Sequence, residues 1–265
     1  MGTLLAVNLG NTRVGVCTFG LPIAHGHTHV LDASFPAPRG ERFAPQLDGL
    51  FPQVGGFFPH GPVEAAVIAS VNPPAEAAVR RWVSETFGIE LLRFPDEVPP
   101  AIRNDYDPPS SLGADRLASA EAAYRMCQSA CIIVDAGTAV TVDAVSADGV
   151  FLGGAILPGL GLCADALARG TALLPRVSLE ETGGLAIGQS TEAGISSGVL
   201  LGVAGAIDRL VAEMASEFGG CDNLYITGGD GPKLQPLCRA HMELDSLLTL
   251  RGLAFAYARR EKPGS

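Results

Sequence analysis

Residues 132–143, with the sequence IIVDAGTAVTVD, constrain the fold more than any other stretch of the chain. An apolar run rich in β-branched residues ends in Asp135, a small Ala-Gly-Thr turn follows, and a second apolar run leaves the turn. This pattern predicts a buried strand, a tight turn and a returning strand. Gly137 lets backbone N–H groups approach an anion, Thr138 adds a hydroxyl donor, and Asp135 can hold a cation that bridges phosphate oxygens. The stretch is therefore a candidate phosphate-binding loop.

The same pattern occurs earlier, in residues 4–16 (LLAVNLGNTRVGV), where Asn8 aligns with Asp135. Two copies of a strand–turn–strand phosphate loop predict a duplicated domain. A third glycine turn, Thr227-Gly228-Gly229, follows apolar residues late in the chain. Two phosphate loops followed by a Gly-Gly turn resemble the actin-like ATPase superfamily, in which the nucleotide lies between two duplicated α/β halves.

This resemblance implies an α/β fold made of duplicated actin-like (ribonuclease H-like) halves. Each half would be a mixed sheet flanked by helices, with a nucleotide cleft between the halves. We expect residues 1–120 to form the amino-terminal half, which carries the first phosphate loop. Residues 121–265 would form the carboxyl-terminal half, which carries the second loop and the Thr227-Gly228-Gly229 nucleotide turn.

Composition excludes several classes of function. The chain of 265 residues has a net charge of −10 at pH 7, which argues against nucleic acid as a partner. Lys233 and Lys262 are the only lysines and no G-x-x-x-x-G-K-[ST] motif occurs, so the chain has no P-loop. The apolar fraction of 47% is that of a globular protein with a sizeable core.

No basic-then-apolar segment opens the sequence, and the longest uncharged runs, 150–164 and 193–207, are too short to span a bilayer. We therefore expect a soluble, cytoplasmic protein without a membrane partner. Six scattered cysteines favour reduced core thiols over a zinc site. Cys127 and Cys131 are four residues apart, as on one helix face, but neither a second close pair nor a nearby histidine accompanies them.

The second informative stretch is residues 106–116, YDPPSSLGADR. Its prolines and serines predict a rigid turn, and residues 117–128 read as an alanine-rich helix. Gly113, Asp115 and Arg116 therefore lie near a helix N-terminus, which suits an anionic substrate. Asp115 can accept a proton from a hydroxyl and Arg116 can bind a carboxylate in a bidentate way. The alternatives are a plain helix cap for Asp115 and an exposed charge for Arg116.

Taken in order, these motifs resemble the type III pantothenate kinase family, a branch of the actin-like superfamily. The resemblance runs from about residue 4 to residue 255. It rests on the ordered set of motifs rather than on any one of them. The matching segments are Gly10-Asn11-Thr12, Tyr106 with Gly113-Ala114-Asp115-Arg116, Asp135-Ala136-Gly137-Thr138, residues 153–159, Leu173-Leu174-Pro175, Gly188-Gln189-Ser190-Thr191, Gly198 and Ile226-Thr227-Gly228-Gly229.

The resemblance implies transfer of the γ-phosphoryl group of ATP to the hydroxyl of pantothenate, the first step of coenzyme A synthesis. Asp115 would be the general base on that hydroxyl, and Arg116 would suit the substrate carboxylate. The substrate-binding residues implied in this way are Tyr106, Gly113, Ala114, Asp115, Arg116 and Thr191.

The same resemblance implies ATP with Mg²⁺ as cosubstrate and a monovalent cation, K⁺ or NH₄⁺, held with the help of Asp135. The implied ATP-binding residues are Asn8, Leu9, Gly10, Asn11, Thr12, Arg13, Val14, Gly15, Thr138, Gly228 and Gly229. Family members are homodimers. A predicted helix with glycine at every fourth residue, positions 194, 198 and 202, would fit either such an interface or close packing inside the domain.

The chain departs from the family pattern at Asn8, where the first loop normally begins with aspartate. Asparagine can hydrogen-bond a metal-bound water but does not offset the charge of Mg²⁺. The loss would reduce the rate by on the order of a hundredfold. One interpretation is a working, slower pantothenate kinase. A second is a catalytically inactive homologue that binds a ligand or regulates a partner, and a third is a phosphatase of the same superfamily acting on phosphate anhydrides.

Overall fold

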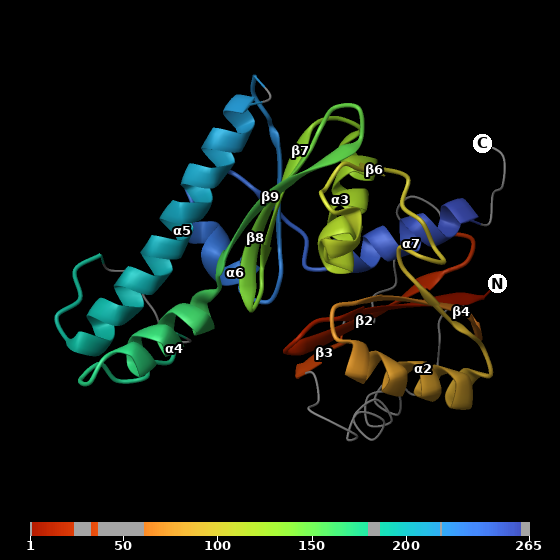
Figure 1. Ribbon diagram of the computed structural model, residues 1–265, viewed down its shortest axis with the longest axis horizontal. Coiled ribbons are helices and arrows are strands. Elements are labelled where there is room, and N and C mark those ends of the chain that lie inside the picture. Colours follow the sequence, from red (N-terminus) through yellow and green to blue (C-terminus); the bar gives the residue numbers. More distant parts are fainter. Residues whose placement is uncertain (1, 24–32, 37–60, 180–185, 218, 261–265) are drawn as a thin grey trace. The chain divides into compact units, whose positions relative to one another are not determined.

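The computed structural model describes residues 2–23, 33–36, 61–179, 186–217 and 219–260 (Figure 1). The chain divides into two compact units. The first contains Met1–Met126 and Leu247–Ser265, and the second contains Cys127–Ser246.

The first unit is built on a five-stranded sheet. Its order is β3-β2-β1-β4-β5, in which β2 and β3 run antiparallel to their neighbours and β4 and β5 run parallel to β1. The central strand is almost fully buried, because helices α2 and α7 both contact this sheet. The strands are β1 (Thr3–Leu9), β2 (Arg13–Gly20), β3 (Ala33–Pro36), β4 (Val63–Ser70) and β5 (Leu91–Arg93).

Helix α2 (Pro73–Phe87) has clear start and stop signals. The Asn72 side chain accepts a hydrogen bond from the Ala75 N–H at 3.4 Å, and prolines occupy the first helical positions. Gly88 ends the helix in the left-handed conformation, with φ of 67°, and donates its N–H to the Ser84 carbonyl. The helix buries Val79, Trp82 and Val83 against the sheet.

Among the described residues, the remaining elements of the first unit are β6 (Arg103–Asn104), the 3₁₀ turn η1 (Pro109–Ser111), α3 (Ala114–Cys127) and α7 (Leu248–Arg260). Helices α3 and α7 pack closely. The Ser119 and Thr249 hydroxyls lie 2.8 Å apart, and a Cβ at Gly252 would collide with the Ala118 carbonyl oxygen.

These contacts explain why the division of the structure differs from the one at residues 120 and 121 that the sequence predicted. In the structure, α7 clusters with the first unit rather than with the second. Its Leu248 and Leu253 are fully buried.

The second unit repeats the sheet of the first. Its strands follow the order β11-β10-β7-β8-β9, with β7, β8 and β9 antiparallel and with β10 and β11 parallel to β7. The central strand β7 thus has one antiparallel neighbour, β8, and one parallel neighbour, β10, as β1 has β2 and β4. This equivalence confirms the prediction of duplicated mixed sheets. The strands are β7 (Cys131–Ala136), β8 (Ala139–Val145), β9 (Val150–Pro158), β10 (Asn223–Thr227) and β11 (Glu243–Leu244).

The described part of the second unit also contains four helical segments: α4 (Leu160–Gly170), α5 (Thr191–Glu217), α6 (Gly231–Leu234) and the 3₁₀ turn η2 (Gln235–Leu237). By length and composition alone, α5 could cross a membrane. Buried core helices pass the same test, and α5 places Val199, Val203 and Ile207 in a core shared with Val134 and Val142.

The glycines of α5 do not serve close packing within the described part of the chain. A Cβ added at Gly194, Gly198 or Gly202 would have no described atom within 4 Å, and all three positions are exposed. Of the two predicted roles, packing inside the domain is therefore wrong for these glycines.

Candidate active site

The first predicted phosphate loop is the turn between β1 and β2. The Gly10 N–H donates to the Arg13 carbonyl at 2.9 Å, which closes the turn. Leu9 and Val14, which pair across the hairpin, are fully buried and anchor it. Asn11, Thr12 and Arg13 are exposed between these anchors. The turn therefore presents backbone and polar side chains to solvent from a rigid base.

Asn8, one residue before this turn, has an orphaned polar atom. Its Oδ1 is buried and has no hydrogen-bond partner among the described residues. Leaving a buried acceptor unsatisfied costs about 1–3 kcal/mol, so a group that donates to it or coordinates it would be favoured here. A neutral oxygen of this kind is a suitable ligand for Mg²⁺ or for a water bound to Mg²⁺. The residue present therefore fits the metal that accompanies ATP.

Tyr106 and Arg116, both named as substrate-binding residues by the resemblance, lie together in the first unit. The Arg116 guanidinium carbon is 5.4 Å from the centroid of the Tyr106 ring, a cation–π contact. Arg116 is only 7% exposed, so its interpretation as an exposed charge is wrong. The Tyr106 N–H donates to Asn104 Oδ1 at 3.0 Å, which fixes the segment that carries the ring.

Asp115 occupies the second position of α3. Its Oδ1 accepts a hydrogen bond from the Arg116 N–H at 2.8 Å. A capping side chain stands before the helix, and here Gly113 holds that place, with its carbonyl accepting the Leu117 N–H at 3.2 Å. The plain cap interpretation of Asp115 therefore does not fit. Burial raises the pKa of Asp115 above its ordinary value of 3.8, and the Arg116 N–H and guanidinium partly oppose that rise.

Gly113 keeps room for this carboxylate. A Cβ at position 113 would lie 2.6 Å from Asp115 Oδ1 and 3.7 Å from Val71 Cγ1. Val71 in turn donates its N–H to the Leu9 carbonyl at 3.1 Å. The N-terminus of α3 and the end of β1 thus meet through Val71, which places Asp115 and the first phosphate loop at the same edge of the sheet.

The sequence analysis did not single out Glu121, which follows Asp115 further along α3, as a residue with a structural role. Its Oε2 accepts the N–H groups of Ala101 at 2.8 Å and Ile102 at 3.1 Å, just before the Tyr106 segment. Glu121 is buried, and burial raises the pKa of its carboxyl group. A lone glutamate among the alanines of α3 was the available signal.

The second predicted phosphate loop lies between β7 and β8 in the second unit. The Gly137 N–H donates to the Ala139 carbonyl at 3.0 Å, and Thr138 is exposed at the tip. Asp135, at the end of β7, is half-buried. Gly228 lies against it: its φ is 87°, and a Cβ there would be 2.5 Å from both Asp135 Oδ1 and the Ala136 carbonyl oxygen. Loop and Gly-Gly turn therefore form one continuous surface.

Thr191 and Asp135 are the predicted substrate-binding and cation-binding residues of the second unit. Thr191 is exposed as the first residue of α5, after Ser190, whose hydroxyl accepts the Ala193 N–H at 3.1 Å. Asp135 is not part of a metal cluster, since the described residues include no group of three His, Cys, Asp or Glu side chains that could hold an ion. A cation at Asp135 would need further oxygens from backbone, water or phosphate.

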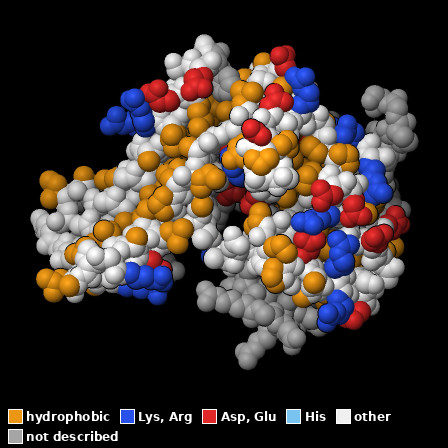
Figure 2. All heavy atoms as spheres, in the orientation of Figure 1, with side chains coloured by type: hydrophobic (Ala, Val, Ile, Leu, Met, Phe, Trp, Pro, Cys, Tyr) orange, Lys and Arg blue, Asp and Glu red, His pale blue; other side chains and the backbone are white. Residues whose placement is uncertain are grey.

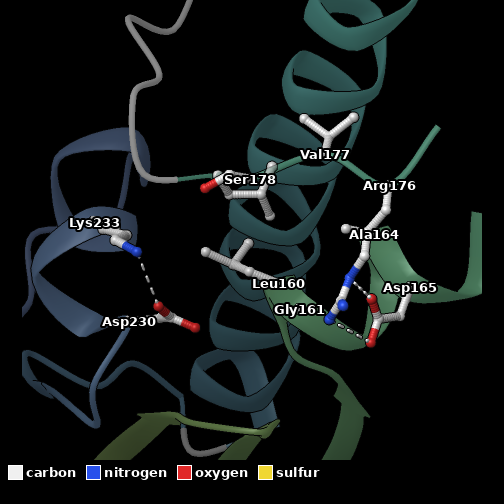
Figure 3. Close-up of a pocket in the computed structure, with 10 residues that line it drawn as sticks. Leu160, Gly161, Ala164, Asp165, Arg176, Val177, Ser178, Asp230 and Lys233 are labelled. Carbon is white, nitrogen blue, oxygen red and sulfur yellow. Dashed lines mark hydrogen bonds and ion pairs between the residues drawn. The ribbon is translucent and has the colours of Figure 1, made fainter. Parts of the chain in front are cut away.

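A pocket of about 320 Å³ lies beside the Gly-Gly turn in the second unit (Figure 3). Its charged side chains are paired: Arg176 Nε lies 2.8 Å from Asp165 Oδ1, and Lys233 Nζ lies 3.5 Å from Asp230 Oδ1. None of the predicted site residues lines it. With its cations neutralised, the pocket offers no net charge to phosphate.

Known proteins resemble this chain both in sequence and in fold. The family model of type III pantothenate kinase matches residues 4–213. The type III pantothenate kinase of Rubrobacter xylanophilus is 43% identical over 201 residues, covering 74% of this chain and 76% of that protein. That of Anaeromyxobacter sp. strain K is 35% identical over 260 residues, covering 97% of this chain and 99% of that protein.

Among solved structures, a ROK family glucokinase from Streptomyces griseus, in complex with glucose and AMPPNP, matches with a TM-score of 0.56. It is 14% identical, and the match covers 98% of this chain and all of that chain, so it shows the actin-like kinase fold alone. The near full-length sequence matches carry the finer conclusion: the chain belongs to the type III pantothenate kinase family.

Proposed function

We propose that this chain transfers the γ-phosphoryl group of ATP to the hydroxyl of pantothenate with Asp115 as the general base. The observation that carries the proposal is the setting of Asp115 at the start of α3. Its Oδ1 is held by the Arg116 N–H at 2.8 Å, which leaves Oδ2 to take the proton from the hydroxyl. A carboxylate whose pKa is raised by burial is a better proton acceptor than an exposed one.

Arg116 and Tyr106 are the proposed carboxylate end of the substrate pocket, with Gly113, Ala114 and Thr191 as its other lining residues. The Tyr106 ring orients the guanidinium, whose planar fork suits a carboxylate. With the carboxylate held, the hydroxyl at the other end of pantothenate is the group that Asp115 meets. Fixing both ends supplies the positioning on which phosphoryl transfer depends.

The ATP phosphates are assigned to the two loops, residues 8–15 and Thr138, together with Gly228 and Gly229. Their backbone N–H groups act as anion donors in place of a P-loop lysine. Mg²⁺, when bound, would neutralise charge on the phosphate oxygens. Asn8 Oδ1, which is buried without a hydrogen-bond partner among the described residues, is the protein atom that would orient the metal or its water. Asp135 is the proposed ligand of the monovalent cation, K⁺ or NH₄⁺.

We also propose a cytoplasmic homodimer. The second unit exposes large apolar side chains, among them Ile156 at 62% and Leu152 at 49%, and Leu162 and Leu167 on α4. Figure 2 shows hydrophobic side chains gathered over α4 and α5. The exposed glycines of α5 would let a partner helix approach closely. Light scattering after gel filtration distinguishes a dimer from a monomer.

Asn8 favours a second candidate, a homologue that binds ligand without turnover. The Asn8 side chain keeps a buried oxygen where the expected aspartate would have one, but it lacks the negative charge that would offset Mg²⁺. Such a protein would bind pantothenate through Tyr106 and Arg116 and would act through a partner. The phosphatase interpretation gains no support from the site.

The deciding experiment is ADP release by the purified protein with ATP, Mg²⁺ and K⁺, with and without pantothenate. Wild type, Asn8→Asp and Asp115→Ala are compared. Turnover that depends on pantothenate, and that Asp115→Ala abolishes, supports the proposal. Turnover that survives Asp115→Ala rejects the base assignment. Activity in Asn8→Asp alone assigns the defect to Asn8, and silence in both favours the binding protein.

A further inference from the structure

Three cysteines of the second unit gather where α3 passes into β7. Cys127 is the last residue of α3, Cys131 is the first residue of β7, and Cys221 lies just before β10. The Cys127 thiol donates to the Ser129 carbonyl at 3.2 Å, and the Cys131 thiol and the Tyr225 phenol on β10 are further hydrogen-bond partners of the Cys127 sulfur. The Cys221 thiol donates to the Ala130 carbonyl at 3.5 Å. None of this chemistry enters the proposed kinase site.

The turn between the two thiols accounts for their proximity. Gln128, directly after Cys127, has φ of 50°, the left-handed conformation that reverses the chain after a helix. The helix therefore stops, and three residues later the chain enters β7 with Cys131 beside Cys127. The predicted arrangement, two thiols on one helix face, is wrong, because only Cys127 is in the helix.

The two thiols differ in access. Cys131 is fully buried, whereas Cys127 is partly exposed and can meet a solute from solvent. They also differ in acidity. The hydrogen bond from Cys131 is the main cause that lowers the pKa of Cys127 to about 6, and the Tyr225 phenol adds to it. The carboxyl end of a helix by itself disfavours an anion, so these donors must outweigh it.

We infer that Cys127 and Cys131 form an oxidisable dithiol site, in which Cys127 reacts with a hydroperoxide and Cys131 resolves the product as a disulfide. This inference is independent of the proposed kinase function. An accessible thiolate beside a resolving cysteine is the arrangement on which reversible thiol oxidation depends.

The first step joins the Cys127 sulfur to the terminal oxygen of the hydroperoxide. The S–O bond forms, the O–O bond breaks, and the leaving oxygen takes a proton to become an alcohol, or water from hydrogen peroxide. In the second step the Cys131 sulfur attacks the Cys127 sulfenic acid. The S–S bond forms, the S–O bond breaks, and the hydroxyl leaves with the Cys131 proton as water. The two thiols lose two electrons and the hydroperoxide gains them.

The structure favours Cys131 over Cys221 as the resolving thiol. Cys131 hydrogen-bonds directly to Cys127, whereas the Cys221 thiol is directed to the Ala130 and Asn223 carbonyls. The hydrogen bond to Cys127 is also the largest cause of the raised pKa of Cys131. Oxidation of Cys127 removes the thiolate that accepts this hydrogen bond. The Cys131 thiol is then easier to ionise, and its thiolate can attack the Cys127 sulfenic acid.

The test treats the reduced full-length protein with hydrogen peroxide, blocks remaining thiols, then reduces and labels the oxidised ones with a second reagent. Cys163 is the internal reference, because it is partly exposed and its thiol donates to the Pro158 carbonyl at 3.6 Å. We expect Cys127 and Cys131 to be oxidised together and several-fold faster than Cys163, with a mass decrease of two hydrogens. Equal rates at Cys127 and Cys163, or oxidation of Cys127 paired with Cys221, would overturn the inference.

Two variants sharpen the result. Cys127→Ser should protect Cys131 from peroxide. Cys131→Ala removes the hydrogen bond that favours the Cys127 thiolate, so it should slow the oxidation and stop it at a Cys127 sulfenic acid that dimedone traps. Oxidation of Cys131 in Cys127→Ser would reject the order of the steps. Cys131 is buried, so that variant is checked by its thermal unfolding. If it does not fold, dimedone trapping in the wild type at early times decides whether the sulfenic acid forms at Cys127.

Discussion

Gly113 stands directly against the carboxylate of Asp115, since a Cβ at position 113 would lie 2.6 Å from Asp115 Oδ1. The atom it would meet is the end of a flexible side chain rather than backbone. Gly113→Ala is therefore expected to leave folding stability nearly unchanged while it displaces the carboxylate. A misplacement of this size lowers kcat by about 10²-fold. Steady-state kinetics and thermal unfolding are measured together.

The matched control is Gly161→Ala on α4, where an added Cβ would have no described atom within 4 Å. That variant should keep wild-type kcat. If Gly113→Ala retains full kcat, the close approach of Gly113 and Asp115 has no part in the reaction.

Asp115 sets the pH dependence of the rate. A general base works only when ionised, so kcat/KM should fall as the pH drops through the pKa of Asp115. Because burial raises that pKa, the acid limb lies above the pH at which an exposed carboxyl with pKa 3.8 would titrate. Asp115→Asn should lower kcat by about 10²–10⁴-fold and abolish the limb. Asp148→Asn, in an exposed turn, should leave the profile unchanged.

The effect of Asp115 on folding stability depends on pH in the opposite direction to its effect on the rate. The folded state binds the Asp115 proton more tightly than the unfolded chain does, because its folded pKa is raised. The contribution of Asp115 to the free energy of unfolding is therefore present at low pH and lost as pH rises through the folded pKa. Denaturant unfolding of wild type and Asp115→Asn at several pH values measures the difference, which should grow as the pH is raised.

Arg116 tests the carboxylate end of the pocket. Arg116→Lys keeps the charge but loses the planar fork and its contact with the Tyr106 ring. We expect KM for pantothenate to rise about tenfold with a smaller change in kcat, because the contact orients substrate in ground state and transition state alike. A larger fall in kcat than rise in KM would contradict this role. Arg103→Lys, at an exposed position, is the control.

Local patterns predicted what depends on a few consecutive residues. The two strand–turn–strand loops, the turn at residues 108–111 and the start of α3 each have their own glycine, proline or periodicity signal. Because the two loops repeat one pattern, the duplicated sheets were predictable as well. The assignment of Tyr106 and Arg116 to one substrate pocket came from the resemblance to the family rather than from spacing, and their contact was not predicted.

Long-range pairing is what the sequence could not supply. Helix α7 packs with α3 through Ser119 and Thr249, which are 130 residues apart, and neither has a distinctive neighbourhood in the sequence. Glu121 serves backbone groups about 20 residues earlier, so its function depends on a loop whose path the sequence does not encode locally. Buried polar contacts of this kind become visible only when the partners are placed in space.

Gly228 tests whether the Gly-Gly turn and Asp135 act as one surface. With φ of 87° and a Cβ that would lie 2.5 Å from Asp135 Oδ1, Gly228→Ala combines backbone strain with a collision. We expect a loss of about 1–3 kcal/mol in the free energy of unfolding and a higher KM for ATP, because Asp135 must move. Gly219→Ala separates the two causes, since Gly219 has φ of 74° but an added Cβ there would meet no described atom within 4 Å. If both variants lose the same stability and keep the same KM for ATP, strain alone is at work and Asp135 is not part of the nucleotide surface.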